Sequence, residues 1–107
     1  MFTKEIAIKK ATDFAKELIT SGIHLKKVIL FGSYANNNQH EWSDIDVALV
    51  ADEFTGFGFE DRKHFSKINI KKDYLDIETK TYPTSYFEQS DPFIEEIIKT
   101  GIVIYDL

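Results

Sequence analysis

The sequence predicts an α/β (α+β) fold in which helices pack on a small mixed β-sheet of three to four strands. Two short apolar runs, residues 26–31 and 45–50, are each long enough for a buried strand, and they flank a polar connection. Residues 73–81 alternate between polar and apolar side chains, as a half-buried strand does. Apolar residues at helical spacing lie before and after these runs, and strands that alternate with helices favour helix layers on a sheet.

The bulk properties exclude several classes of protein. With 107 residues, the chain is expected to form one domain over residues 1–107. Cysteine is absent, which excludes disulfides and thiolate metal sites. No apolar run approaches the length of a membrane span and the first residues do not resemble a signal peptide, so we expect a cytoplasmic protein without membrane contacts. The net charge of −5 argues against a nucleic-acid-binding surface, which needs a basic face.

Helix and strand signals are clear at the start of the chain. Thr3 is a good N-cap for a helix over residues 4–21, which Gly22 ends. The strand over residues 26–31 follows, and a helical turn over residues 33–37 comes next. A polar loop over residues 36–40 continues from that turn, and we expect Trp42 to have a packing role rather than to cap the loop.

The middle of the chain holds the second and third strands. Residues 45–50 are almost wholly apolar after Asp46, which predicts a strand buried on both faces. A loop over residues 51–59 and a helix over residues 59–70 are expected next. In the strand over residues 73–81, one face would carry Tyr74, Asp76, Glu78 and Lys80, and the other Leu75, Ile77 and Thr79.

The last third of the chain carries further boundary signals. Pro83 ends the third strand because proline cannot donate to the ladder, and residues 85–89 suit one helical turn. Asp91-Pro92 begins a helix as N-cap and first helical residue, and Gly101 ends that helix. Residues 102–105 predict a final short strand.

Gly32-Ser33 at the end of the first apolar run suits a phosphate. Glycine lets the backbone approach a ligand closely, and serine is a good N-cap for a following helical turn. The start of such a turn presents free N–H groups and the positive end of a dipole. We therefore expect Gly32 and Ser33 to bind nucleotide phosphates.

Asp44 and Asp46 begin the second apolar run and would point to the same face of a strand. Two adjacent carboxylates repel each other unless a positive group lies between them, and hard oxygen ligands suit Mg²⁺. Taken alone, the pair could also be the solvated end of a strand. Next to Gly32-Ser33, it indicates a site for a metal and a nucleotide.

These residues also resemble a known family. Gly32-Ser33, ten intervening residues and Asp44-Ile45-Asp46 are similar to the signature of the DNA polymerase beta-like nucleotidyltransferase superfamily. The wider Phe31–Ala35 and Ser43–Val47 segments resemble the minimal nucleotidyltransferases of HEPN/MNT toxin–antitoxin pairs. The resemblance implies a polymerase beta palm-like fold. The family usually continues with Arg-Gly where Asn36-Asn37 stand here, and the loss of the arginine charge puts the level of activity in question.

The resemblance also implies a third carboxylate on a neighbouring strand. Asp76 is the candidate, because it lies between Leu75 and Ile77 as the family's third acidic residue lies between apolar residues. Glu78 is the alternative. Asp44, Asp46 and Asp76 would then hold two Mg²⁺ ions, with Mn²⁺ as a substitute, and carry the catalysis.

The expected activity is metal-dependent transfer of a nucleoside monophosphate, AMP from ATP, onto a hydroxyl group. The chain offers no second domain to hold an acceptor, so we expect a partner protein or a second copy of the chain to supply it. By resemblance, the acceptor is a tyrosine of a HEPN-type toxin, which the protein would silence as an antitoxin. Two alternatives are a non-catalytic antitoxin or binding module of the same fold, and a nucleotidyltransferase acting on a small molecule.

Overall fold

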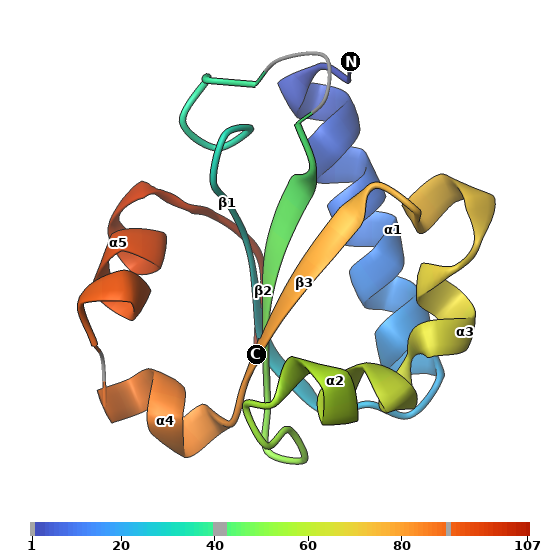
Figure 1. Cartoon of the computed structure of the whole chain (residues 1–107), viewed down its shortest axis with the longest axis vertical. Coiled ribbons are helices and arrows are strands. Elements are labelled where there is room, and N and C mark those ends of the chain that lie inside the picture. The colour runs from blue at the N-terminus through green and yellow to red at the C-terminus, as the bar shows by residue number, and fades with distance from the viewer. Residues whose placement is uncertain (1, 40–42, 90) are drawn as a thin grey trace.

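The computed structural model describes residues 2–39, 43–89 and 91–107, and helices cover both faces of its sheet (Figure 1). His40, at the end of the predicted polar loop, and Trp42 lie outside the described residues. The elements are, in order, α1 (Lys4–Thr20), β1 (Leu25–Phe31), β2 (Ile45–Ala51), α2 (Gly58–Asp61), η1 (Arg62–His64), α3 (Ser66–Asn69), η2 (Lys72–Tyr74), β3 (Ile77–Tyr82), α4 (Thr84–Gln89), α5 (Pro92–Thr100) and β4 (Ile102–Asp106).

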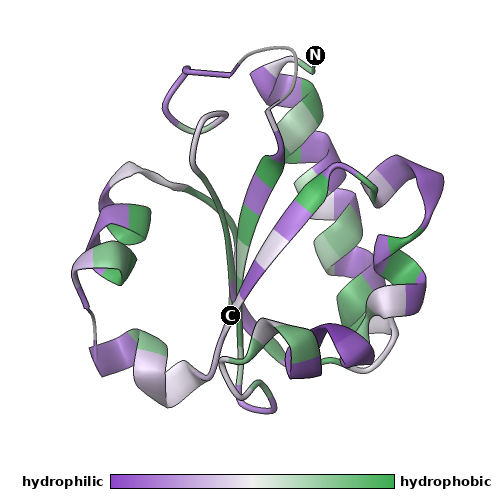
Figure 2. Cartoon of the chain, in the orientation of Figure 1, coloured by the Kyte–Doolittle hydropathy of each residue, from purple (hydrophilic) through white to green (hydrophobic). Residues whose placement is uncertain are grey.

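The four strands form one mixed sheet in the order β3-β2-β1-β4. β1 lies in the interior and pairs antiparallel with both β2 and β4, whereas β2 pairs parallel with β3. This arrangement confirms the predicted fold class. It also leaves β3 and β4 as the two edge strands. In Figure 2 the strands β1 and β2 are largely coloured as apolar, in keeping with their burial in the middle of the molecule.

Helix α1 covers one face of the sheet. Thr3 caps it by accepting a hydrogen bond from the Ile6 amide at 3.1 Å, and the chain turns away at Gly22, whose φ is +105°. Its apolar stripe is buried, as the sequence predicts, and consists of Ala7, Ala11, Phe14, Ala15 and Leu18. The opposing residues of the strands include Val28, Leu30, Ile45, Val47 and Leu49.

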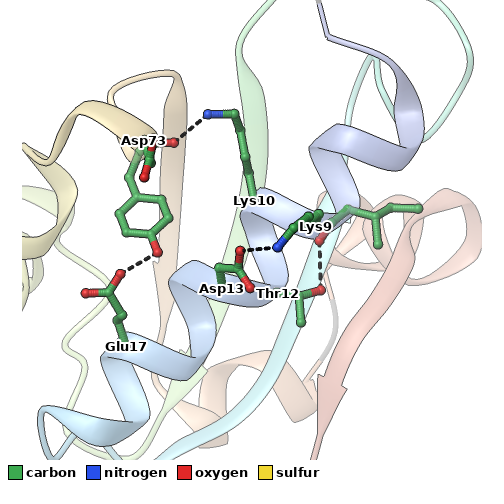
Figure 3. A network of polar contacts seen from close by, with 8 residues as sticks. Lys9, Lys10, Thr12, Asp13, Glu17 and Asp73 are labelled. Atoms are coloured by element: carbon green, nitrogen blue, oxygen red, sulfur yellow. Dashed lines mark hydrogen bonds and ion pairs between the residues drawn. The ribbon is translucent and has the colours of Figure 1, made fainter.

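The segment before β3 departs from the predicted strand over residues 73–81. Residues 72–74 form a 3₁₀ turn, and the strand begins only at Ile77. Tyr74 is buried against α1, with its ring 5.3 Å from that of Phe14, and its hydroxyl donates to Glu17. Lys10 also reaches this segment and donates to the Asp73 carbonyl at 2.8 Å (Figure 3). Tyr74 therefore belongs to the face opposite the one predicted.

A single helix over residues 59–70 is also not formed. The segment is divided into α2, η1 and α3, because Phe65 has a φ of −141° and interrupts the helical path. Phe65 is buried against Phe14 and Phe54, and Asp61 is buried as well. Tertiary packing of these two side chains overrides the helical periodicity of the sequence.

Helices α4 and α5 cover the other face. Tyr82, Phe87, Ile94 and Ile97 form a second core there with Ile29, Ala48 and Val50. The Asp91 carboxylate accepts from the Ile94 amide at 2.8 Å, and Gly101 ends α5, so both predicted caps are confirmed. No helix in the described ranges is both long and apolar enough to cross a membrane.

Candidate nucleotide and metal site

Gly32 and Asp46 are in direct contact where β1 ends and β2 begins. The register pairs Phe31 with Asp46, and Gly32 follows at once with a φ of +77°. A Cβ atom on Gly32 would lie only 2.3 Å from a carboxylate oxygen of Asp46. A side chain at position 32 would thus displace this carboxylate, and glycine is required both for the backbone angle and for the close approach.

The turn over residues 32–37 follows β1, as predicted. The Gly32 carbonyl accepts from the Asn36 amide at 3.1 Å, and the Ser33 carbonyl accepts from the Asn38 amide at 2.8 Å. Asn37 has a φ of +59°, the left-handed conformation that glycine adopts freely and asparagine tolerates. Asn37 therefore fills the backbone role that suits the glycine of the Arg-Gly pattern, whereas Asn36 leaves the arginine charge unreplaced.

Four acidic residues lie in two rows at the start of β2 and β3. The register pairs Asp46 with Glu78 and Ile45 with Ile77, so Asp44 and Asp76 are the residues that precede the second pair. The Ile45 amide donates to the Asp76 carbonyl at 2.8 Å and thereby extends the parallel ladder to this row. All four predicted or alternative carboxylates are thus brought to one end of the sheet.

Asp46 has the most perturbed environment of these carboxyls. Burial, followed by the negative charges of Asp44 and Glu78, raises its pKa from 3.8 to about 6. Asp76 lies in an exposed turn and does not contribute to this shift. Of the two candidates for the third carboxylate, Glu78 therefore affects the pKa of Asp46, whereas Asp76 does not.

The donor atoms suit a hard divalent cation. Carboxylate oxygens are the ligands that Mg²⁺ prefers, and the mutual repulsion of Asp44, Asp46 and Glu78 is what a cation would relieve. In the described ranges, however, no three acidic or histidine side chains converge closely enough to form a preassembled metal site. The carboxylates would have to draw together around an ion.

A cavity of about 420 Å³ begins at Asp46 and Glu78 and extends along β3. Phe31 and Phe93 line it, and their rings meet edge to face at 6.0 Å. Lys80 also lines it, with its ammonium 5.2 Å from the Phe93 ring. Sequence analysis did not select Lys80 or Phe93, although Lys80 shares the strand face of Glu78 and could have been found by that alternation.

Asp61 is a second residue that sequence analysis missed. Its carboxylate is fully buried and accepts hydrogen bonds from the Thr55 amide and hydroxyl, the Gly56 amide and the Thr81 hydroxyl. Burial acts to raise its pKa, but these hydrogen bonds outweigh burial and hold the pKa below its ordinary value. Asp61 thus fastens the loop beside the cavity to β3. Thr55 and Gly56 lie only six and five residues before Asp61, but the link to Thr81 spans 20 residues, and no local pattern marks it.

A glycine–serine turn packed against paired carboxylates suits the binding of a nucleotide with a metal, so the site is typical of nucleotide-binding proteins. Residues 14–107 match the family described as Polymerase beta, Nucleotidyltransferase. The chain belongs to this nucleotidyltransferase family, as its signature residues predict.

Solved structures share the fold. A candidate nucleotidyltransferase from Sulfolobus solfataricus is 19% identical with a TM-score of 0.68, over 96% of this chain and 83% of that one. A toxin–antitoxin complex with AMP-PNP is 21% identical with a TM-score of 0.62, over 90% of this chain and 73% of that one. A mutant of the toxin–antitoxin pair MntA–HpeT, in which two aspartates are replaced by glutamates, gives 19% identity and a TM-score of 0.57 over the same shares. The comparison with curated proteins found no match.

Proposed function

We propose that this protein is a metal-dependent nucleotidyltransferase that moves AMP from ATP onto a hydroxyl group of a partner protein, as the antitoxin of a HEPN-type toxin. The observation that carries the proposal is the contact of Gly32 with Asp46, which joins the phosphate-binding turn to the paired carboxylates. Toxin–antitoxin complexes among the structures of similar fold, one with AMP-PNP, support the choice of nucleotide and partner.

Each residue has a distinct role in this proposal. Gly32 and Ser33 hold the phosphates of the nucleotide with their backbone N–H groups and the serine hydroxyl. Asp44 and Asp46 hold two Mg²⁺ or Mn²⁺ ions, which when bound neutralise the phosphate charge and stabilise both the attacking and the leaving oxygen. Asp76 is the third carboxylate, at the acceptor side, with Glu78 as the alternative.

The reaction is a displacement at phosphorus. The acceptor hydroxyl oxygen forms a bond to the α-phosphorus of ATP, the bond from that phosphorus to the bridging oxygen breaks, and pyrophosphate leaves. The hydroxyl proton passes to the acceptor-side carboxylate. Most of the barrier reduction comes from positioning and charge neutralisation, so the asparagine at position 36 is compatible with slow turnover.

Calorimetry of ATP binding tests the donor side. The wild type should bind ATP in the presence of Mg²⁺, and the double variant Asp44→Asn, Asp46→Asn should remain folded but lose the metal-dependent part. Asp52→Asn is the matched control, because Asp52 follows the other end of β2 and its side chain is 66% exposed. Equal affinity in the wild type and the double variant would refute the assignment of these two aspartates.

Intact mass tests the reaction itself. The protein is incubated with ATP, Mg²⁺ and a candidate HEPN-type partner protein, and we expect the partner to gain the mass of one AMP. If the partner is neutralised equally well by the wild type and by the double variant without any gain in mass, the non-catalytic antitoxin is the correct function instead.

A further inference from the structure

The outer edge of β3 offers unpaired backbone groups. The Ile45 amide donates to the Asp76 carbonyl, so Asp76 directs this group toward β2. Every second residue of a strand directs its backbone groups to the same side, so Glu78 also directs its N–H and C=O toward β2. Thr79, the residue after Glu78, therefore directs its N–H and C=O away from the sheet. The carbonyl of Ile77 already meets the Asn69 side-chain amide at 3.4 Å. Beyond it, no backbone–backbone hydrogen bond joins residues 78–82 to any described segment other than β2.

The cavity at Asp46 covers the α5 face of the strand ends, where Phe31, Asp46 and Phe93 line it, and it also reaches the outer edge of β3. Four consecutive residues, 78–81, line it, and consecutive residues of a strand point to opposite faces. Only a space beside the strand edge can be bordered by both sets. Gly56 and Gly58 also line the cavity, and the Arg62 guanidinium lies against Gly58 in the same wall.

Two buried hydroxyl groups beside the edge have no hydrogen-bond partner among the described residues. Thr79 is 8% exposed and its Oγ1 is unpaired, and it lines the cavity at Asp46. Tyr82 is 6% exposed and its Oη is unpaired, and it lines an adjoining cavity of about 540 Å³ that shares Lys80 and Phe93. Buried hydroxyls are normally satisfied, so each indicates a missing polar partner.

The strand order separates this edge from the nucleotide turn. Gly32 follows β1 on one side of β2, whereas four of the residues that line the cavity, 78–81, belong to β3 on the other side, and Phe31 is the one lining residue from β1. Neither Gly32 nor Ser33 lines the cavity, and Asp46 lies between the two regions. On the proposed function, the nucleotide enters from the β1 side, so the β3 side is left for the acceptor.

We propose that the outer edge of β3 binds an extended segment of the partner protein by strand addition, and that this segment carries the acceptor tyrosine. The inference rests on the proposed function for the identity of the acceptor. The outward N–H and C=O groups of Thr79 and Thr81 would pair with the segment's backbone, as in other cases of β-strand addition. Unpaired edges of this kind invite such pairing.

Charge complementarity defines the segment further. Glu78 and Lys80 stand two residues apart on one face of β3, and their side chains are exposed. Side chains directly opposite in neighbouring strands interact, so a tyrosine opposite Glu78 would place its hydroxyl by the carboxylates. An acidic side chain two positions away would then face Lys80. The expected segment thus carries a tyrosine and an acidic residue separated by one residue.

Peptide binding without ATP tests this inference independently of catalysis. The probe is a short capped, fluorescently labelled peptide of alternating threonine and valine, with one tyrosine and one glutamate two positions apart, and binding is followed by anisotropy. Thr79→Pro removes the outward N–H without removing a bond to β2, and should weaken binding about tenfold. Thr79→Val keeps that N–H and should weaken binding by only about twofold to threefold.

Charge reversal keeps the test decisive if the proline variant does not fold. Lys80→Glu should weaken binding of the glutamate peptide and strengthen binding of a peptide with lysine in its place. Equal binding of both peptides by the wild type and Lys80→Glu, or equal binding of an N-methylated peptide that cannot pair, would overturn the inference. Peptide binding without AMP transfer would refute the proposed function alone, and AMP transfer to a partner without peptide binding would refute the strand addition alone.

Discussion

At the level of single residues, the negative charge of Asp46 destabilises the folded protein. Its pKa is about 6 when folded, against an ordinary value of 3.8, so the folded state binds more protons between these pH values. Stability of the metal-free protein should therefore fall as pH rises through this window, and the penalty is complete above it. The full shift corresponds to about 3 kcal/mol, and screening at this half-buried carboxylate reduces it to about 1–2 kcal/mol.

Thermal unfolding of Asp46→Asn measures this penalty. The variant should melt about 5 °C above the metal-free wild type at pH 7.5, because the charge is absent. Below about pH 3 the two proteins should melt alike, because Asp46 is then protonated in both states of the wild type. Mg²⁺ should stabilise the wild type near neutral pH and lose this effect as the pH falls below about 6. A variant that melts below the wild type at pH 7.5 would contradict the assignment.

The third carboxylate is the other question that single residues decide. We expect Asp76→Asn to abolish AMP transfer but leave most ATP binding, since an acceptor-side carboxylate removes the hydroxyl proton and does not hold the phosphates. Glu78→Gln is the matched variant, because Glu78 stands opposite Asp46 in the next row. It should shift the pH profile of transfer toward lower pH by removing a negative neighbour of Asp46. Loss of transfer in Glu78→Gln alone would assign the role to Glu78.

At the level of elements, Asp61 joins a loop to a strand. Replacing it with alanine leaves the Thr55 amide, the Gly56 amide and the Thr81 hydroxyl without their acceptor. Each buried group left unpaired costs about 1–3 kcal/mol, and we expect a total loss of about 3–5 kcal/mol in the free energy of unfolding. Denaturant unfolding checks this, with Glu60→Ala as the control. Glu60 is exposed and forms a surface ion pair with Lys63, so its loss should cost less than about 1 kcal/mol.

Elements with strong local signals were predictable from the sequence, and elements set by distant contacts were not. The first and last helices carry their own caps at Thr3 and Asp91, which the structure confirms. The region of residues 59–70 carries helical periodicity, but Phe65 packs against Phe14 and Phe54 while Asp61 bonds Thr81 of β3, and these distant contacts are revealed only by the folded chain. The prediction that Tyr74 shares a strand face with Asp76 and Glu78 is wrong for the same reason.

The candidate site divides in the same way. Gly32, Ser33, Asp44 and Asp46 could be selected because glycine–serine and the paired aspartates are short motifs. The meeting of Gly32 with Asp46 agrees with that selection, whereas the catalytic roles stay predictions. Pairing of Glu78 with Asp46 depends on the register of two strands separated by 25 residues of loop and short helices, and no local pattern fixes it.

At the level of the whole molecule, the sheet order would give each side of β2 its own task under the proposed function. The turn after β1 and the cavity along β3 meet at Asp46, and α1 and α5 lie on opposite faces of the sheet (Figure 1). A nucleotide and a protein segment could therefore approach the carboxylates from opposite sides without competing for the same surface. The fold alone thus accommodates a two-substrate reaction in a small chain.

The pairing of β1 with β4 has a consequence for the folding pathway. Lys27 contacts Asp106 across a separation of 79 residues, so the interior strand must wait for a partner that leaves the ribosome much later. Closing so long a loop slows folding, and meanwhile the apolar edge of β1 is open to other chains. Lys26 and Lys27 directly precede the apolar run 28–31 of β1, and charged residues that flank an apolar strand discourage aggregation. Lys26 and Lys27, which form ion pairs in the folded protein, would thus also reduce aggregation of the nascent chain.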